Sequence, residues 1–261
     1  MRLAKNVHEV SIPSHLDAAA ATHVGRREQN EDAWLLDPKH ALFAVADGMG
    51  GHFGGSVASS LTVEALRSFY ERAAGSEPVL WANAGDDPSP GERRLDMAIR
   101  LTQRAIEEAA EGPLSEMGST LVAMQFAKGL ALIAHVGDSR AYRLRGQMVK
   151  QLTQDHSLIE ALVAQGSFKL AASLSARYQG VVTRSLGPVG DSNADLQTVE
   201  ALPGDVFLAC SDGLSGVLAA EDIASLLSLP SAAEASRALV DAAYAAGGSD
   251  NITAVVVRIE G

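Results

Sequence analysis

Cysteine and long apolar runs are scarce in this sequence, and each absence excludes a class of protein. Cys210 is the single cysteine among 261 residues, which excludes an internal disulfide, a multi-cysteine zinc site and an iron–sulfur cluster. No run of about eighteen apolar residues could span a membrane, and Met1–Ser14 lacks the apolar segment of a signal peptide. We therefore expect a soluble, cytoplasmic protein.

Positive charge is also in short supply. The chain has 21 Lys and Arg residues against 32 Asp and Glu residues, a formal net charge of −11. This balance argues against binding nucleic acid or an anionic membrane, since both require a basic surface. A hydrophobic content of 47% is sufficient for a sizeable core, so the chain should fold and its acidic residues can gather around cations.

The signature motifs of several classes of phosphate-binding and metal-binding proteins are missing. A cysteine phosphatase needs Cys-x5-Arg, but Gly216 stands at the arginine position after Cys210. The Gly-Lys-Ser/Thr of a P-loop does not occur, and Phe53 stands where a dinucleotide-binding loop needs its third glycine. An EF-hand loop and the zinc motif His-Glu-x-x-His are absent too. Thiol catalysis is therefore excluded, and nucleotide binding has no support.

Short apolar runs separated by tight turns predict a mainly antiparallel β-structure. Turns such as Lys128-Gly129 and Arg145-Gly146-Gln147 join consecutive runs as hairpins. The predicted strands are residues 33–36, 41–46, 120–127, 130–136, 141–144, 148–152, 181–185, 206–210 and 252–259.

Amphipathic stretches between these runs predict helices on the outside of the sheets. The expected helices cover residues 56–73, about 93–109, 157–165, 221–227 and 232–246. Residues 75–91 are rich in Gly, Pro, Ser and Asp and predict a surface loop, while residues 1–17 predict a loose polar tail. We expect an α+β sandwich in which two packed, mainly antiparallel sheets are flanked by helices, as a single domain over residues 18–261.

Aspartates stand at the ends of four predicted strands. Three directly follow an apolar run and the fourth precedes one: Asp47, Asp138, Asp212 and Asp250. A single Asp-Gly after a strand is most often only a turn, but four such positions favour a shared site. If the strands lie side by side, the four carboxylates converge on one rim together with Glu31 and Asp32.

Carboxylates gathered in this way repel one another unless cations lie between them. Oxygen ligands without a His or Cys cluster select Mn²⁺ or Mg²⁺ over zinc, and these ions usually keep bound water. Two such ions can convert water into a nucleophile at neutral pH. The pattern therefore predicts a hard-cation centre with hydrolytic chemistry.

A series of short motifs resembles the metal-dependent protein phosphatases (PPM, type 2C) in their bacterial form, over about residues 18–259. Each motif is weak alone, but eight in the family's order are specific. They are Arg27–Asp32, Val45–His52, Gly118–Thr120, Val136–Arg140, Leu152–Ser157, Thr183–Gly187, Cys210–Gly213 and Ser249–Asn251.

The resemblance implies a β-sandwich whose two-metal centre hydrolyses phosphoserine and phosphothreonine. Asp47 matches the carboxylate that bridges two Mn²⁺ or Mg²⁺ ions, and Gly48 matches the carbonyl ligand. Asp212 and Asp250 match the carboxylates that complete the first metal site, and Glu31 matches a ligand of the second.

Three further residues take roles from the same resemblance. Asp32 matches a carboxylate that orients metal-bound water, and Asp138 matches a ligand of a third metal ion. Arg27 matches the phosphate-binding arginine, a role that suits the fixed pair of donors on a guanidinium. Arg26 is expected to be a surface residue.

The sequence also departs from the family pattern. Met49 replaces the histidine of animal members, so the general acid is left open between His52 and a metal-bound water; packing of the glycine-rich turn is the alternative role for His52. We expect Asp155 and its neighbours to cap a helix and His135 to be a core histidine. Residues 166–180 stand where the family has a flap, without its His-Pro.

Three functions fit these residues: a phosphoprotein phosphatase, a hydrolase of small phosphoesters, and a catalytically silent phosphoprotein-binding module. The complete set of Asp47, Asp212 and Asp250 favours an enzyme. We expect a monomeric serine/threonine phosphatase that acts on phosphorylated proteins and reverses a bacterial serine/threonine kinase.

Overall fold

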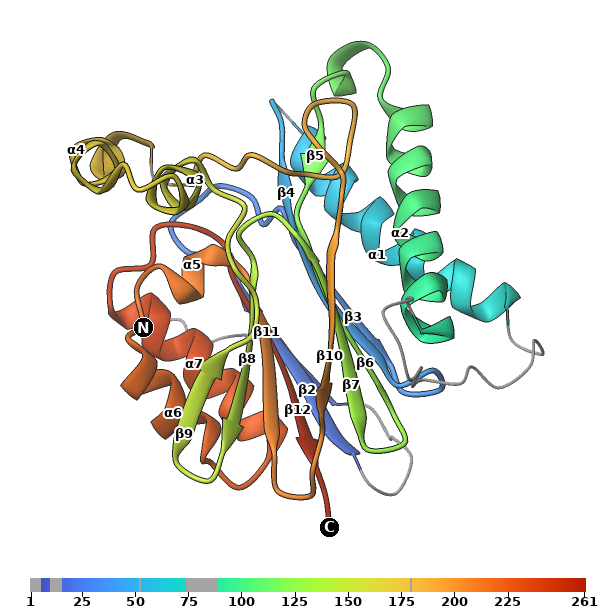
Figure 1. Ribbon diagram of the computed structural model, residues 1–261, viewed down its shortest axis with the longest axis vertical. Coiled ribbons are helices and arrows are strands. Elements are labelled where there is room, and N and C mark those ends of the chain that lie inside the picture. Colours follow the sequence, from blue (N-terminus) through green and yellow to red (C-terminus); the bar gives the residue numbers. More distant parts are fainter. Residues whose placement is uncertain (1–5, 10–15, 52, 74–88, 179) are drawn as a thin grey trace.

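The predicted fold class is confirmed by a computed structural model, which describes residues 6–9, 16–51, 53–73, 89–178 and 180–261. The described residues form two six-stranded sheets. The sheets pack face to face, and helices cover both outer faces (Figure 1). Every pair of neighbouring strands named below is antiparallel, as the hairpin turns predict.

The first sheet is built around the C-terminal strand. Its order is β1 (Asn6–Glu9), β2 (Leu16–His23), β12 (Ile252–Ile259), β11 (Val206–Cys210), β8 (Arg140–Arg145) and β9 (Met148–Gln151). Its outer face packs against α5 (Asp212–Ser215), α6 (Ala220–Leu227) and α7 (Ala232–Ala245). The helix α7 begins at Ser231, whose side chain accepts a hydrogen bond from the Glu234 amide.

The second sheet carries the two long helices. Its order is β10 (Asp195–Glu200), β7 (Leu130–Val136), β6 (Leu121–Ala127), β4 (Leu42–Met49) and β3 (Asp32–Asp37), and β5 (Gly118–Ser119) pairs with β4. Its outer face packs against α1 (Gly54–Arg72) and α2 (Pro90–Ala109). A short 3₁₀ helix, Gly112–Leu114, follows α2. Ser89 and Glu92 form a capping box that starts α2.

Alternate residues of a strand serve different cores, because successive side chains point to opposite faces of a sheet. Along β4, Leu42 and Ala44 pack with the helices, whereas Phe43 and Val45 pack between the sheets. The two sheets therefore share one apolar layer and position each other's strand ends.

A helical hairpin projects from one end of the sandwich. It consists of α3 (Leu158–Ala164) and α4 (Phe168–Tyr178). The two helices pack mainly against each other, and Figure 1 shows them standing away from the sheets. Within residues 166–180, for which the sequence predicted no secondary structure, the structure thus places α4 at residues 168–178.

Three expectations for local structure are wrong. The loose tail over residues 1–17 contains β1, and β2 begins at Leu16, because their backbones pair. Residues 181–185 are not a strand, since they lie outside both sheets and form isolated bridges only. Residues 75–88 of the expected loop lie outside the described residues, but Pro90 and Gly91 begin α2.

The strand β10 and the helix α4 were not predicted. β10 is a half-exposed edge strand, so its sequence lacks a continuous apolar run. In α4, Phe168 and Leu170 are exposed, so the helix lacks a buried stripe that marks it. No helix within the described ranges combines the length and apolarity required to cross a membrane.

Candidate metal centre

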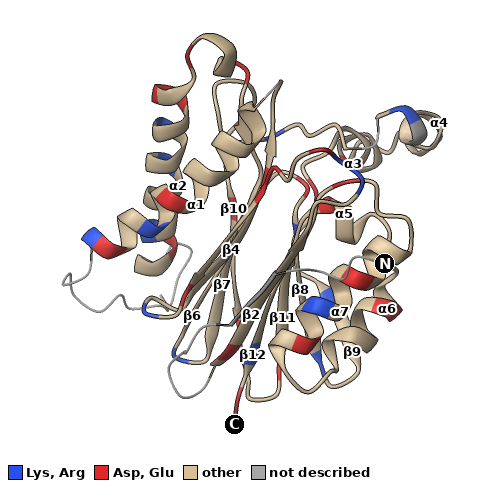
Figure 2. Ribbon diagram, turned by 180° about the vertical axis from the view of Figure 1, so that it is seen from behind, with Lys and Arg blue, Asp and Glu red and all other residues tan. Residues whose placement is uncertain are grey.

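The predicted acidic residues meet at one end of the sandwich. Asp47 in β4 lies directly opposite Asp32 in β3. Asp212 begins α5 immediately after β11, and Asp250 comes just before β12. Asp138 lies in the turn between β7 and β8. Figure 2 shows acidic residues gathered around these strand ends, between the two sheets.

A cavity of about 600 Å³ opens at this end. Seven of the eight predicted site residues line it: Arg27, Glu31, Asp47, Gly48, Asp138, Asp212 and Asp250. Met49, Gly50, Thr120, Gly180 and Val182 are also in its wall. Asp32, the eighth, is not in the lining. The convergence of strand-end carboxylates is therefore present in the structure.

Gly48 shows why this position excludes a side chain. A Cβ atom placed there would lie 1.9 Å from the Gly55 carbonyl oxygen and 2.8 Å from that of Glu31. The Gly48 amide donates to the same Glu31 oxygen at 3.1 Å. The start of α1 can pack against β4 only because glycine leaves this space. Gly48 thus keeps its backbone beside Glu31 and in the cavity wall.

Asp32 is held by hydroxyl groups of the first sheet. Its Oδ2 accepts hydrogen bonds from Ser211 Oγ at 2.8 Å and Thr253 Oγ1 at 2.6 Å. Its Oδ1 is buried and has no hydrogen-bond partner in the described part of the chain. Burial raises the pKa of Asp32 to about 7, although both hydroxyls act to lower it. One oxygen is therefore fixed while the other is free to bind a ligand.

Burial and mutual repulsion also raise the pKa of Asp47, Asp138 and Asp212. Burial raises the pKa of Asp47 well above its ordinary value, and the Asp32 and Asp212 charges raise it further. Burial, followed by the Asp212 charge, raises the pKa of Asp138 to about 7. The pKa of Asp212 is raised by burial and by Asp250. These carboxylates lack enough positive charge from the protein to stay ionised easily.

The residues fit a divalent cation by a second observation. Three carboxylate oxygens are buried without a hydrogen-bond partner among the described residues: Glu31 Oε1, Asp32 Oδ1 and Asp212 Oδ1. Buried polar atoms in proteins are nearly always paired, so three orphaned oxygens at one site indicate a ligand. An all-oxygen set of this kind suits Mn²⁺ or Mg²⁺.

Arg27 is at the rim of the cavity. Its Nη2 donates to Asp250 Oδ2 at 2.7 Å, and its side chain is 58% exposed. Gly25 permits this arrangement, because its φ of +63° and its approach to the Asp250 backbone both exclude a side chain. The predicted phosphate-binding arginine therefore faces the acidic residues.

Asn251 and Thr120 support the site, and the sequence suggested no role for either. Asn251 Oδ1 accepts from the Glu31 amide at 2.8 Å, while its Nδ2 donates to the carbonyls of Val24 and Gln29. Thr120 Oγ1 accepts from the Asp47 amide at 3.0 Å. Both residues belong to the short motifs quoted above, which was the available signal.

The expectation that Asp155 and its neighbours cap a helix is confirmed for Ser157 and wrong for Asp155. Arg140 donates two hydrogen bonds to its carboxylate, at 2.8 and 2.7 Å, and this pair occupies both oxygens. The neighbouring Ser157 caps α3 instead, by accepting from the Glu160 amide. His135 is a buried strand residue whose Nε2 bonds to the Gln154 carbonyl, as expected. His52 lies outside the described residues.

Comparison with known proteins identifies close relatives. The family model described as protein phosphatase 2C matches residues 20–251. The serine/threonine protein phosphatase PstP of Mycobacterium tuberculosis is 35% identical over 237 residues, which are 89% of this chain and 43% of that protein. The chain thus spans less than half the length of this relative. The serine/threonine phosphatase stp of Listeria monocytogenes is 33% identical over 250 residues, covering 93% of this chain and 96% of that protein.

Solved structures agree with this result. A crystal structure of M. tuberculosis PstP/Ppp has a TM-score of 0.81 and 34% identity, and the match covers 95% of this chain and 100% of that one. The catalytic domain of PstP in complex with two manganese ions has a TM-score of 0.78 and 34% identity, over 95% of this chain and 99% of that one.

Proposed function

Because this chain belongs to the protein phosphatase 2C family, we propose that it hydrolyses phosphoserine and phosphothreonine in proteins, with Mn²⁺ or Mg²⁺ as cofactor. One observation carries the proposal. The predicted arginine and six predicted metal-binding residues line a single cavity. The two manganese ions held by the PstP catalytic domain support the same assignment.

Seven residues of the cavity wall and its rim supply the ligands and the phosphate contact that we propose. Asp47, Asp212 and Asp250 would hold a first ion, Glu31 would hold a second with Asp47, the Gly48 carbonyl would be a further ligand, and Asp138 would hold a third ion. When bound, the ions activate a water molecule as the nucleophile and offset charge that develops on the phosphoryl group.

Asp32 lies outside the cavity lining and acts on the water molecule rather than on a metal ion. Its Oδ2 is engaged by the hydroxyls of Ser211 and Thr253, so the carboxylate cannot rotate freely. Its Oδ1 is left to accept a hydrogen bond from the attacking water and so to orient it. Asp32 is thereby a catalytic residue that orients the water.

Arg27 binds the phosphoryl group. A guanidinium offers two parallel donors to phosphate oxygens, and the exposed Arg27 side chain can turn toward the cavity from Asp250. A phosphate competes well for this contact because Asp250 is also required as a metal ligand. Arg27 therefore contributes mainly to substrate binding.

The partners are inferred from relatives and composition. The named relatives are serine/threonine phosphatases, which supports phosphorylated proteins as the substrates and a serine/threonine kinase as the enzyme that is reversed. A single catalytic domain over residues 18–261 agrees with the family match to residues 20–251. A monomeric, cytoplasmic enzyme stays a prediction of the sequence.

The test is phosphate release from a phosphothreonine peptide and from p-nitrophenyl phosphate, each with Mn²⁺ and with a chelator. We expect Mn²⁺-dependent turnover of the peptide, and Asp250→Asn should abolish it while circular dichroism stays unchanged. Turnover of the small ester alone would indicate a hydrolase of small phosphoesters. Peptide binding without any phosphate release would indicate a silent binding module.

A further inference from the structure

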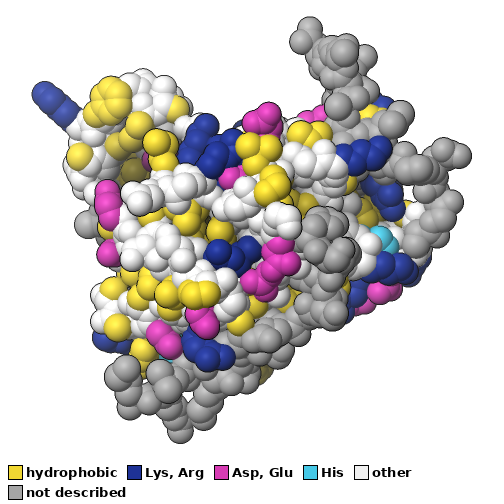
Figure 3. Space-filling model, turned by 90° about the horizontal axis from the view of Figure 1, so that it is seen from below, with side chains coloured by type: hydrophobic (Ala, Val, Ile, Leu, Met, Phe, Trp, Pro, Cys, Tyr) yellow, Lys and Arg dark blue, Asp and Glu magenta, His cyan; other side chains and the backbone are white. Residues whose placement is uncertain are grey.

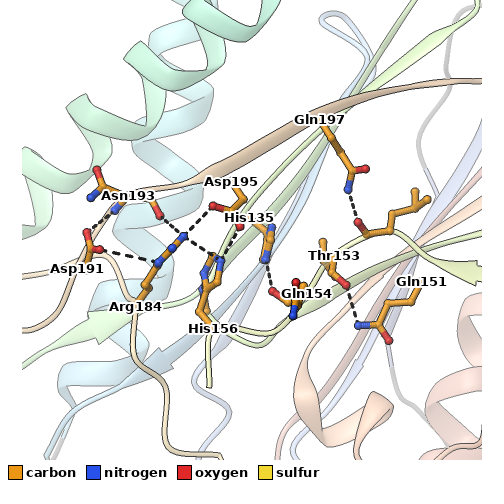
Figure 4. A network of polar contacts seen from close by, with 12 residues as sticks. His135, Gln151, Thr153, Gln154, His156, Arg184, Asp191, Asn193, Asp195 and Gln197 are labelled. Carbon is orange, nitrogen blue, oxygen red and sulfur yellow. Dashed lines mark hydrogen bonds and ion pairs between the residues drawn. The ribbon is translucent and has the colours of Figure 1, made fainter. Parts of the chain in front are cut away.

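A buried histidine, His156, lies beside the metal centre, where the protein phosphatase 2C assignment leaves it without a role. Its ring contacts the partly exposed side chains of Arg184 and Asp195, and we call these three residues the His156 cluster. Figure 4 shows their side chains pointing toward one another, with His135 beside them. The rings of His135 and His156 stack with centroids 4.3 Å apart, and both residues are less than a tenth exposed.

The hydrogen bonds of the cluster fix the His156 tautomer. The Gly137 amide donates to His156 Nδ1 at 3.1 Å, so this nitrogen carries no hydrogen. Nε2 therefore carries it and donates to Asp195 Oδ2 at 3.1 Å. Arg184 Nη1 donates to the other oxygen of Asp195 at 2.7 Å. The ring thus joins Gly137 on one side to the Asp195–Arg184 pair on the other.

His156 holds the turn that carries Asp138. Besides the ring contact, its backbone amide donates to the Gly137 carbonyl at 2.8 Å. Gly137 has a φ of +105°, and a Cβ there would lie 2.6 Å from the Thr120 side chain. This turn therefore has little room to adjust, and both polar groups of Gly137 are fixed by His156.

His156 also lies at the base of the α3–α4 hairpin. The Thr183 amide donates to its carbonyl at 2.8 Å, and the Leu158 amide donates to the Val181 carbonyl at 2.9 Å. Because α3 and α4 pack mainly on each other, these base contacts largely decide where the hairpin lies. Val182 and Gly180 continue from the base into the cavity wall.

The His156 cluster and the adjacent His135 do not form a metal-binding site. His135, His156 and Asp195 are residue types that bind metals, and their ligand atoms lie within 4.8 Å of one another. Arg184 Nη1, however, already donates to Asp195 Oδ1 at 2.7 Å, and it lies 3.1 Å from His156 Nε2, which is itself a donor in this tautomer. The guanidinium supplies the positive charge there, and it would repel a cation.

We propose that His156 is a positioning residue that ties the α3–α4 hairpin to the turn carrying Asp138. Through Nδ1 and its backbone it sets the turn, and through Asp195 and Arg184 it holds the base of the hairpin. The link to catalysis rests on the proposed phosphatase function, whereas the mechanical link between hairpin and turn does not.

Three substitutions separate the two halves of this link. In His156→Asn, the side-chain oxygen can replace Nδ1 as the acceptor for Gly137 but cannot reach Asp195. In His156→Gln, the amide nitrogen can reach Asp195, but the Gly137 amide loses its acceptor. His156→Ala removes both contacts. His40→Ala is the matched control, because His40 has a similarly buried ring that bonds to Asp37.

The measurement is amide hydrogen exchange by NMR at Gly137 and Thr183, with β12 as an internal reference. We expect exchange at both amides to speed up by roughly five- to a hundredfold in His156→Ala. His156→Asn should speed up Thr183 alone, and His156→Gln should speed up Gly137 alone. Equal acceleration in β12, or the same pattern in His40→Ala, would reduce His156 to general stability and overturn the proposal.

Kinetics give a second readout. In His156→Asn, the hydrogen bond to Asp195 is lost and the base of the hairpin, which lines the cavity through Gly180 and Val182, is held less firmly. The KM for a phosphopeptide should therefore rise by roughly fivefold, the size expected for one lost hydrogen bond, while kcat on p-nitrophenyl phosphate stays unchanged. His156→Gln should retain the wild-type KM for the peptide. If the wild-type chain released no phosphate at all, the proposed function would fail while the exchange result still decided the role of His156.

Discussion

The strand β11 carries an aspartate near each end, and the two have opposite surroundings. Asp205 precedes the strand, and Arg145 donates to both of its carboxylate oxygens, at 2.8 and 2.7 Å. Asp212 follows the strand and leaves Oδ1 without a partner among the described residues. Burial would raise the pKa of Asp205, but Arg145 and the Leu202 amide lower it overall, whereas the pKa of Asp212 is raised.

The difference shows that a position at the end of a strand does not by itself make an aspartate a metal ligand. The protein supplies the Arg145 cation to Asp205 but leaves Asp212 Oδ1 without a partner among the described residues, which supports the proposal that Asp212 binds a metal ion. Figure 3 shows the end of the sandwich opposite the hairpin, where basic and acidic side chains are interspersed on the visible face. At the end with the cavity, several carboxylates share the partly exposed Arg27.

The largest expected effect comes from replacing the unpaired aspartate. Asp212→Asn should raise the activation free energy at saturating Mn²⁺ by several kcal/mol, and so lower kcat roughly a thousandfold, because it removes the anionic metal ligand that we propose. In the presence of a chelator it should not lower the free energy of unfolding, since one of several repelling charges is gone. Phosphopeptide turnover and urea unfolding measure the two quantities. Turnover at the wild-type rate in this variant would mean that Asp212, like Asp205, is not needed for metal-dependent activity.

Mn²⁺ should stabilise the chain only if the cavity binds it. At one hundred times its dissociation constant, the ion should add about 2.7 kcal/mol to the free energy of unfolding. Asp212→Asn should lose most of this gain, and Asp205→Asn should keep it. Thermal unfolding with and without Mn²⁺ measures the gain. Equal stabilisation of both variants would place the ion elsewhere.

Substitution of Arg27 tests whether this arginine only pairs with an aspartate, as Arg145 does with Asp205, or also binds phosphate. If it binds phosphate, Arg27→Ala should raise KM more than it lowers kcat, by about 1.5 to 3 kcal/mol, or roughly ten- to a hundredfold. Arg27→Lys should recover part of this, because Lys keeps the charge but not the paired donors.

Arg26→Ala is the control for the register of this motif. Inhibition by free phosphate should weaken in parallel with KM in Arg27→Ala. Unchanged KM and phosphate inhibition in that variant, with both altered in Arg26→Ala, would shift the assignment by one residue and move Glu31 and Asp32 with it.

The sequence predicted the residues that line the cavity better than it predicted the residues that support them. Asp47 and Asp212 follow the apolar runs of β4 and β11, and an apolar run is a signal that a sequence shows directly. The hydroxyl partners of Asp32 are far from it in sequence, because Ser211 follows β11 and Thr253 lies in β12. Serine and threonine are also common on any protein surface, so neither residue stands out in the sequence. Their role becomes visible only when the sheets bring them together.

The same reasoning explains why Asp155 was misassigned and His156 was left without a role. An aspartate two residues before a helix resembles a cap, and only the fold reveals that Arg140 takes both oxygens. The contacts of His156 with Gly137 and Asp195 cross 19 and 39 residues of sequence. Pairings at such distances leave no periodic trace in a single sequence.

The smallest effect is expected at the paired end of β11. Asp205→Asn should lower the free energy of unfolding by about 1 to 2 kcal/mol, because it replaces charge-assisted hydrogen bonds by neutral ones and Arg145 is partly screened by solvent. Turnover should stay at the wild-type value, since Asp205 lies at the other end of the strand from the cavity. Urea unfolding near neutral pH measures the loss, with the exposed Asp222→Asn as the control.

The pH dependence of this loss gives the sharper test. Because the pKa of Asp205 is lowered in the folded chain, its ionised form stabilises the fold fully above the ordinary value of about 3.9. That stabilisation is lost as the pH falls through the lower folded pKa, and asparagine has no such titration. The gap between wild type and Asp205→Asn should therefore be constant from neutral pH down to about 5 and close at lower pH. A gap that widened on acidification would mean that the pKa of Asp205 is raised, and the two ends of β11 would no longer differ.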